Sequence, residues 1–141
     1  NLLDDFEGIR TVDFIAGTSA FYRKDVFDRI GMFDVNYIMY HEDIEFGLRM
    51  KKQTSYRLCT FSDKLVTHLL VTSIPREGLW YYASRNLVDL SKKYAPRFLP
   101  NTLIHIMIFY VAIHLARAVR YAFAGILGTM DGLLGRKIRS Y

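Results

Sequence analysis

The sequence predicts an α/β fold followed by a helical tail. Three short apolar segments bounded by small or polar residues are typical of strands: 11–22, which enters a small-residue turn, 56–60 and 64–70. The spacing of apolar residues predicts two helices among them, 24–30 and 41–52. After Pro75 the pattern is helical, from Glu77 to Tyr94 and again from Thr102 to about Leu127. We therefore expect two parts, residues 1–95 and residues 96–141.

Composition and charge narrow the class of protein. The chain has 141 residues, 51% of them hydrophobic, which suffices for the core of one domain. It begins at Asn1 rather than Met, so we expect a piece of a longer protein. The single cysteine, Cys59, excludes an intrachain disulfide and a multi-cysteine zinc site. The net charge is +5, but the cations alternate with apolar runs, which favours a membrane surface over nucleic acid as partner.

The predicted helix 41–52 carries acids in its first turn and bases in its last, as the helix dipole favours. Ile44 and Leu48 are one turn apart and are expected to share a face. Arg49 is expected to pair with a nearby acid in a structural role. Gly31 is placed to end the preceding helix in a left-handed conformation.

The tail contains an uncharged segment. From Phe98 to Ala116 there are 19 residues without Asp, Glu, Lys or Arg, close to the roughly 20 that cross a bilayer. Asn101, His105 and His114 interrupt it. Three interpretations stay open for residues 102–127: a helix that docks on the membrane surface, a true span, and a soluble helix.

Glu42 and Asp43 form an acidic pair at the start of the predicted helix 41–52. The positive end of a helix stabilises an ionised carboxylate, so such a position suits a general base. Acids are also common at helix starts simply because they cap the helix. The pair alone therefore leaves both interpretations open.

The surrounding motifs add weight to the catalytic interpretation. In order they are Gly17, Arg23, Gly31-Met32-Phe33-Asp34, Tyr37, Tyr40, Glu42-Asp43-Ile44-Glu45, Arg49, His68 and Tyr81-Tyr82-Ala83-Ser84-Arg85-Asn86. This order and spacing resemble the carboxy-terminal half of family 2 glycosyltransferases, which have the GT-A fold. The tail 128–136 looks like that of rhamnosyltransferase-like members. The resemblance is strong over about half of the chain.

The resemblance implies an inverting glycosyltransferase of hexosyltransferase type. Asp43 would be the general base that takes a proton from the acceptor hydroxyl, and Glu42 would orient it. His68 would face a divalent metal, Mn²⁺ or Mg²⁺, that bridges the diphosphate of the donor. The alternative for His68 is a histidine at a strand end, satisfied by hydrogen bonds.

Substrate contacts are expected from four residues. Arg76 and Arg85 suit a diphosphate or an anionic acceptor, because a guanidinium binds phosphate through two hydrogen bonds; a surface ion pair is the alternative for Arg76. Trp80 could stack on a sugar, although aromatic residues in a helix are more often part of the core. Gly17 would let the backbone approach a ligand closely.

The resemblance thus predicts a bacterial enzyme of envelope polysaccharide synthesis. The donor would be a nucleotide-diphosphate sugar, and the acceptor a glycan or a lipid-linked glycan. The protein would lie at the cytoplasmic face of the inner membrane, peripherally or with one carboxy-terminal span. The nucleotide-binding half of the family is missing from this sequence, so these residues alone are expected to be inactive. The alternative is a non-catalytic membrane-docking or interaction module with a glycosyltransferase-like shape.

Overall fold

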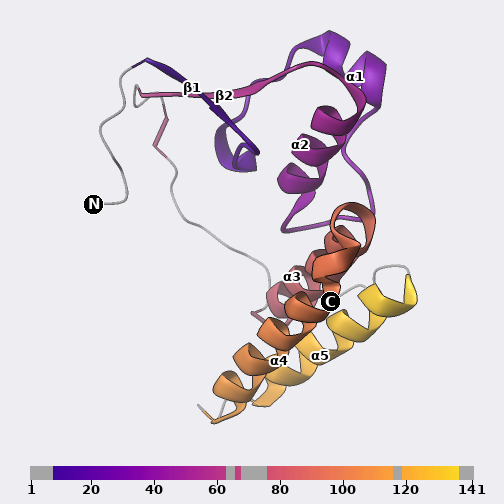
Figure 1. Cartoon of the computed structure of the whole chain (residues 1–141). Coiled ribbons are helices and arrows are strands. Elements are labelled where there is room, and N and C mark those ends of the chain that lie inside the picture. The colour runs from indigo at the N-terminus through magenta and orange to yellow at the C-terminus, as the bar shows by residue number, and fades with distance from the viewer. Residues whose placement is uncertain (1–7, 63–65, 68–75, 116–118, 137–141) are drawn as a thin grey trace. The chain divides into compact units, whose positions relative to one another are not determined.

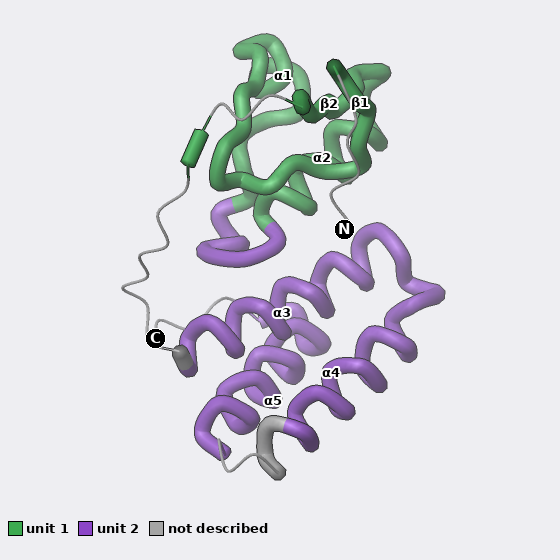
Figure 2. Tube along the Cα trace, turned by 90° about the vertical axis from the view of Figure 1, so that its left-hand side faces the viewer, with its two compact units in different colours: residues 1–34, 42–71 green, residues 35–41, 72–141 purple. Residues whose placement is uncertain are grey.

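The computed structural model describes residues 8–62, 66–67, 76–115 and 119–136. The chain forms two compact units, residues 1–34 with 42–71, and residues 35–41 with 72–141 (Figure 2). Most of the described residues are helical, and a two-stranded sheet completes the first unit (Figure 1). The expectation of a mixed α/β chain is confirmed at this level.

The sheet of the first unit is an antiparallel pair. Strand β1 (Ile9–Val12) pairs with β2 (Leu58–Phe61), with Thr11 opposite Cys59. The predicted strand at 56–60 is thus confirmed with a small shift. The predicted strand that starts at residue 11 ends at Val12, and the short 3-10 helix η1 (Gly17–Ser19) follows. The predicted strand at 64–70 falls outside the described residues, except for residues 66 and 67.

Helices α1 (Lys24–Ile30) and α2 (Glu42–Gln53) confirm the helix predictions of this unit. Their buried core is completed from β2, and its members are Val26, Ile30, Phe46, Met50 and Leu58. Ile44 and Leu48, one turn apart on α2, are both half-buried, whereas the residues that α2 buries fully are Glu45, Phe46, Gly47 and Met50. Gly31 ends α1 with φ 80° and donates its N–H to the Phe27 carbonyl at 2.9 Å. Its ψ of 178° is not that of a left-handed helix.

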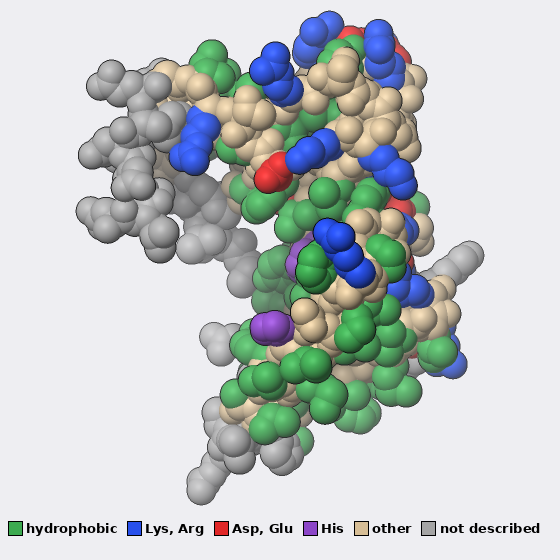
Figure 3. Space-filling model, in the orientation of Figure 1, with side chains coloured by type: hydrophobic (Ala, Val, Ile, Leu, Met, Phe, Trp, Pro, Cys, Tyr) green, Lys and Arg blue, Asp and Glu red, His purple; other side chains and the backbone are tan. Residues whose placement is uncertain are grey.

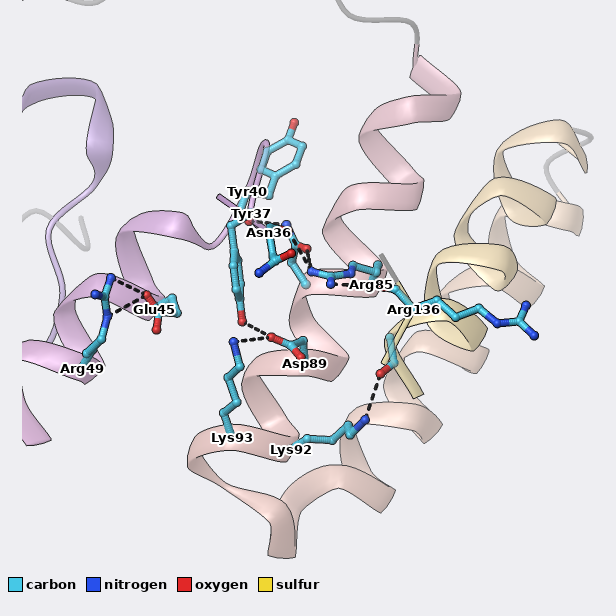
Figure 4. A network of polar contacts seen from close by, with 12 residues as sticks. Asn36, Tyr37, Tyr40, Glu45, Arg49, Arg85, Asp89, Lys92, Lys93 and Arg136 are labelled. Atoms are coloured by element: carbon cyan, nitrogen blue, oxygen red, sulfur yellow. Dashed lines mark hydrogen bonds and ion pairs between the residues drawn. The ribbon is translucent and has the colours of Figure 1, made fainter. Parts of the chain in front are cut away.

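Arg49 has the structural role expected from the sequence. Its guanidinium donates to the carbonyls of Ile30 at 2.7 Å and Met32 at 2.8 Å, at the end of α1. It also pairs with the buried carboxylate of Glu45 at 3.0 Å (Figure 4). A buried ion pair is tolerated when hydrogen bonds satisfy its remaining groups, and these carbonyls supply them. The contact fixes α2 to the carboxyl end of α1.

The second unit is a group of three long helices: α3 (Arg76–Tyr94), α4 (Leu99–Leu115) and α5 (Val119–Leu134). The short 3-10 helix η2 (Pro96–Phe98) joins α3 to α4. The helix predicted over 77–94 is confirmed. The region expected to be helical from 102 to 127 is two helices, with α4 ending at Leu115 and α5 beginning at Val119.

Helix α3 packs against α5 and α4, so this compact unit starts before residue 96. The boundary between residues 95 and 96, as the limit of a catalytic domain, stays a prediction. Within the described residues, no helix combines the length and apolar character needed to cross a bilayer.

Glycines let α5 approach α3 closely. A Cβ on Gly128 would collide with the backbone carbonyl of Tyr81, and a Cβ on Gly132 would lie 2.7 Å from that of Arg85. The two contacts are one turn apart on both helices, a spacing typical of small-residue helix packing. Between them the Tyr81 hydroxyl donates to the buried carboxylate of Asp131 at 3.0 Å.

We predict that Gly128→Ala lowers the free energy of unfolding by about 1–3 kcal/mol, because the added methyl group forces α3 and α5 apart. Helix propensity alone predicts the opposite sign, a gain of about 1 kcal/mol. Urea denaturation decides between them. Met130→Ala, at an exposed position of α5, is the control and should change stability by less than about 0.5 kcal/mol. A Gly128→Ala variant more stable than the wild type would refute the close packing.

Candidate functional site

Asp43 lies in the first turn of α2, where two backbone N–H groups hold its carboxylate. One oxygen, Oδ2, accepts from the N–H of Gly17 at 2.9 Å, and Oδ1 accepts from the N–H of Ile44 at 2.8 Å. The side chain is half-buried, and no cation of the described chain pairs with it. The carboxylate is therefore oriented by neutral backbone donors and by the helix end.

Gly17 reaches the acidic pair through its backbone. A Cβ added at Gly17 would lie 3.6 Å from the Cβ of Asp43 and 3.9 Å from Oε1 of Glu42, which are ordinary contact distances. The contact between η1 and α2 at this point is therefore the hydrogen bond from the Gly17 N–H to Asp43. The space beside Gly17 would accept a Cβ. The structure brings together three of the predicted site residues, Gly17, Glu42 and Asp43.

Glu42 is the more perturbed member of the pair. Burial raises the pKa of its carboxyl group, and the neighbouring charge of Asp43 raises it further. Its Oε2 is buried and has no hydrogen-bond partner among the described residues. A carboxyl group in this state holds its proton to a higher pH than an exposed glutamate does. Two adjacent carboxyl groups in unlike environments are a common feature of sites that move protons.

Tyr22 is a neighbour of this pair that the sequence did not single out. Its ring packs edge-on against Phe46 of α2, with ring centroids 5.0 Å apart. Burial raises the pKa of the Tyr22 hydroxyl, and the negative charge of Asp43 adds to this effect. No local motif marks Tyr22, because its place beside Asp43 depends on the packing of α1 and α2.

The loop of residues 35–41, in the second unit, leads directly into α2 along the chain. Tyr40 and His41 both have positive φ angles, 62° and 70°. This left-handed conformation is uncommon for residues with a Cβ and costs about 1–2 kcal/mol each. It persists only where surrounding contacts impose it, and such strained backbone is concentrated at functional sites.

Asn86 and Arg85 of α3 impose that conformation. The side-chain amide of Asn86, fully buried, donates to the carbonyls of Met39 and Tyr40, both at 2.8 Å. Arg85 donates to the carbonyl of Asn36 at 2.9 Å (Figure 4). The side chains of Arg85 and Asn86 therefore hold the loop by hydrogen bonds to its backbone carbonyls.

Tyr37 fixes the same loop from its other end. Its hydroxyl donates to the carboxylate of Asp89 at 2.6 Å, and Lys93 pairs with that carboxylate at 2.9 Å (Figure 4). The Lys93 ammonium also lies 5.1 Å from the centre of the Tyr37 ring. Asn86 is only the last residue of a sequence motif, and no local pattern singles out Asp89. Each is a polar side chain among apolar helix neighbours, which is a signal for a buried polar contact. Their partners lie 46 to 52 residues earlier in the chain, so the sequence does not reveal them.

The predicted ligand-binding arginines have different outcomes. Arg85 is buried and donates to two backbone carbonyls and to the Oδ1 of Asn86. These contacts favour a structural role over a diphosphate contact. Arg76 begins α3, but its side chain falls outside the described part of the chain, as does His68. Across the described residues, no three His, Cys, Asp or Glu side chains gather into a potential metal site.

Trp80 lines two neighbouring cavities of the second unit. One, of about 470 Å³, also contacts Tyr40 and Tyr121. The other, of about 370 Å³, is lined in part by His41 and His105. These volumes lie within the range of small-molecule pockets. Trp80 thus lines both cavities and also packs against Phe109, with ring centroids 5.1 Å apart, so its contact with a sugar stays a prediction.

Comparisons with protein-family models, curated proteins and solved structures find no match to this chain.

We predict that Asn86→Leu lowers the free energy of unfolding by about 2–4 kcal/mol, because it removes the donor shared by the carbonyls of Met39 and Tyr40 next to a strained backbone. Asn101→Leu is the matched control, since Asn101 is exposed on α4 and its loss should cost less than about 0.5 kcal/mol. Urea denaturation of both variants measures the difference. Equal stabilities would show that Asn86 does not hold the loop.

A second prediction concerns pH. Because folding raises the pKa of Glu42, its contribution to stability is complete below the ordinary value of 4.5 and is lost as pH rises through the folded-state pKa. Glu42→Gln removes that loss. The variant should gain stability relative to the wild type between pH 4 and pH 7 in urea denaturation. Glu77→Gln, which breaks the ion pair with Arg120, should show no such gain. A Glu42→Gln difference independent of pH would exclude the raised pKa.

Proposed function

We propose that this chain is the acceptor-side part of an inverting glycosyltransferase of family 2, with the GT-A fold and a rhamnosyltransferase-like tail. One observation carries the proposal: the Asp43 carboxylate is fixed by the N–H groups of Gly17 and Ile44 and is not paired with a cation among the described residues. A general base must be held in one orientation, and these two hydrogen bonds support that requirement.

In the proposed reaction, an acceptor hydroxyl hydrogen-bonds to Asp43. As its oxygen attacks the anomeric carbon of the donor, its proton passes to the carboxylate. The bond from that carbon to the nucleoside diphosphate breaks on the opposite side, and the leaving group takes the bonding electrons. The configuration is inverted in one displacement. Glu42 supports this step by its position next to Asp43, and its pKa is raised mainly by burial and to a smaller extent by the charge of Asp43.

The proposal includes a divalent metal, Mn²⁺ or Mg²⁺. Its ligands would have to come at least in part from residues that the structure does not describe. The described residues alone form no three-ligand group, so they do not by themselves make a metal site. His68, and the nucleotide-binding half expected in a longer protein, would supply it. When bound, the metal would neutralise charge on the diphosphate.

The substrates follow the same proposal. The donor is a nucleotide-diphosphate sugar, and the acceptor is a glycan or lipid-linked glycan of the bacterial envelope, made at the cytoplasmic face of the inner membrane. The cavities at Trp80 support a sugar or lipid ligand because aromatic side chains line them. The alternative, a docking module without catalysis, draws support from the exposed apolar face of α4 and α5 and predicts that Asp43 is dispensable.

Asp43→Asn in the full-length protein is the test. Transfer from nucleotide sugars with Mn²⁺ or Mg²⁺ should fall by about 10²–10⁴-fold, because an amide cannot accept the proton. Stability should fall by only about 1 kcal/mol, because the single amide oxygen can replace one of the two oxygens that accept N–H groups from Gly17 and Ile44. Asp28→Asn, at an exposed surface pair with Lys24, is the matched control and should retain activity. Transfer at the wild-type rate by Asp43→Asn would exclude the base and favour the docking module.

A further inference from the structure

Helices α4 and α5 expose two apolar stripes. On α4 the exposed side chains Ile104, Met107, Ile108 and Val111 follow the i, i+3, i+4, i+7 spacing of one helix face. On α5 a matching series recurs every three or four residues: Val119, Phe123, Ile126, Met130, Leu133 and Leu134. Figure 3 shows hydrophobic side chains gathered over this part of the molecule. Exposed series of this length are unusual on a soluble surface and mark a site of contact.

A groove joins the two stripes into one surface, called here the α4–α5 face. The groove has a volume of about 370 Å³. Met107 and Val111 line it from α4, and Ile126 and Met130 line it from α5. Because the same four side chains belong to the stripes, the apolar surface continues across both helices without a polar break.

Three polar side chains of these helices bond to the preceding turn of the chain, whereas Tyr110 and Asp131 bond to α3. Thr102 donates to the carbonyl of Phe98 at 3.1 Å, and Thr129 donates to that of Gly125 at 2.9 Å. The Nδ1 of His105 lies 2.7 Å from the carbonyl oxygen of Asn101. Each bond spans four residues, the pattern by which polar side chains are accommodated in apolar surroundings. A protein partner would be expected to meet hydrogen-bonding groups at regular intervals, and this face offers few.

Charge identifies the partner. Helix α4 contains no charged residue. Ten Lys and Arg residues stand against three acids between residues 72 and 141. The acids are engaged: Glu77 with Arg120, Asp89 with Lys93 and Asp131 with Arg136. An apolar face on a unit with surplus positive charge is complementary to an anionic bilayer.

We propose that the α4–α5 face embeds in the surface of an anionic membrane, with the groove between the helices taking up an acyl chain. The face lies along the bilayer at the depth of the headgroup boundary, and the surrounding cations contact lipid phosphates. This deepens the membrane association proposed above and rests on it for biological context, but it does not depend on Asp43.

The test is vesicle flotation with the full chain. Ile108→Glu with Phe123→Glu changes two face residues that are 64% and 61% exposed, and it should lower partitioning into phosphatidylglycerol-containing vesicles at least tenfold. Phe21→Glu with Val35→Glu adds the same charge at sites 87% and 88% exposed outside the face, and it should lower partitioning far less. Wild-type binding to pure phosphatidylcholine should be weaker than to anionic vesicles.

Equal losses in the two double variants, or no loss in either, would overturn the proposal. A third outcome would also overturn it: Ile108→Glu with Phe123→Glu converts a dimer to a monomer and leaves vesicle binding unchanged. That result would show that a second copy of the chain covers the face. If the charged variant loses helix content, Ile108→Ser with Phe123→Ser gives the same comparison without added charge. Transfer to a soluble acceptor tests Asp43 separately, so the two proposals can fail independently.

Discussion

The side-chain amide of Asn86 is the contact on which the second unit most depends. It binds the carbonyls of Met39 and Tyr40 from within α3, next to two residues with positive φ. Without a buried donor, these carbonyls would have to turn toward water, and the left-handed backbone would lose what holds it. Arg85 and Tyr37 add to the same loop, but they act at its earlier residues. The Arg-Asn pair is therefore best understood as a backbone clamp.

At Asp43, helix capping and catalysis make the same structural demand. A capping carboxylate must accept backbone N–H groups at a helix start, and a general base must be held in one orientation. The hydrogen bonds from Gly17 and Ile44 satisfy both. Asp43 has no cation partner within the described residues, whereas Glu45 pairs with Arg49, and the proposed role of Asp43 as a base uses that difference. Asp43 is thus distinguished by the contact it lacks as well as by those it makes.

The sequence predicted the helices well because their signals are local. Helices α1, α2 and α3 follow apolar spacing and dipole-matched ends. It failed where the outcome depends on distant segments. The buried side of α2 is set by packing on α1 and β2, which Ile44 and Leu48 do not reveal. The role of Arg85 depends on a loop 49 residues earlier, and the hairpin of α4 and α5 replaced one expected helical region. For the site, the structure brings Gly17, Glu42 and Asp43 together. No local pattern marks Tyr22, and the motif that contains Asn86 does not reveal its contacts with residues 39 and 40.

The packing of α3 on α5 and the exposed face of α4 and α5 are consistent with one physical constraint. Helices that contact lipid gain little from the hydrophobic effect when they associate, since lipid tails are as apolar as the side chains they replace. Close contact between backbones then supplies the attraction, and Gly128 and Gly132 permit it against Tyr81 and Arg85. In the same surroundings a polar side chain must find its partner nearby, and Thr102 and Thr129 do so within one turn. Both features agree with the membrane contact proposed for the α4–α5 face.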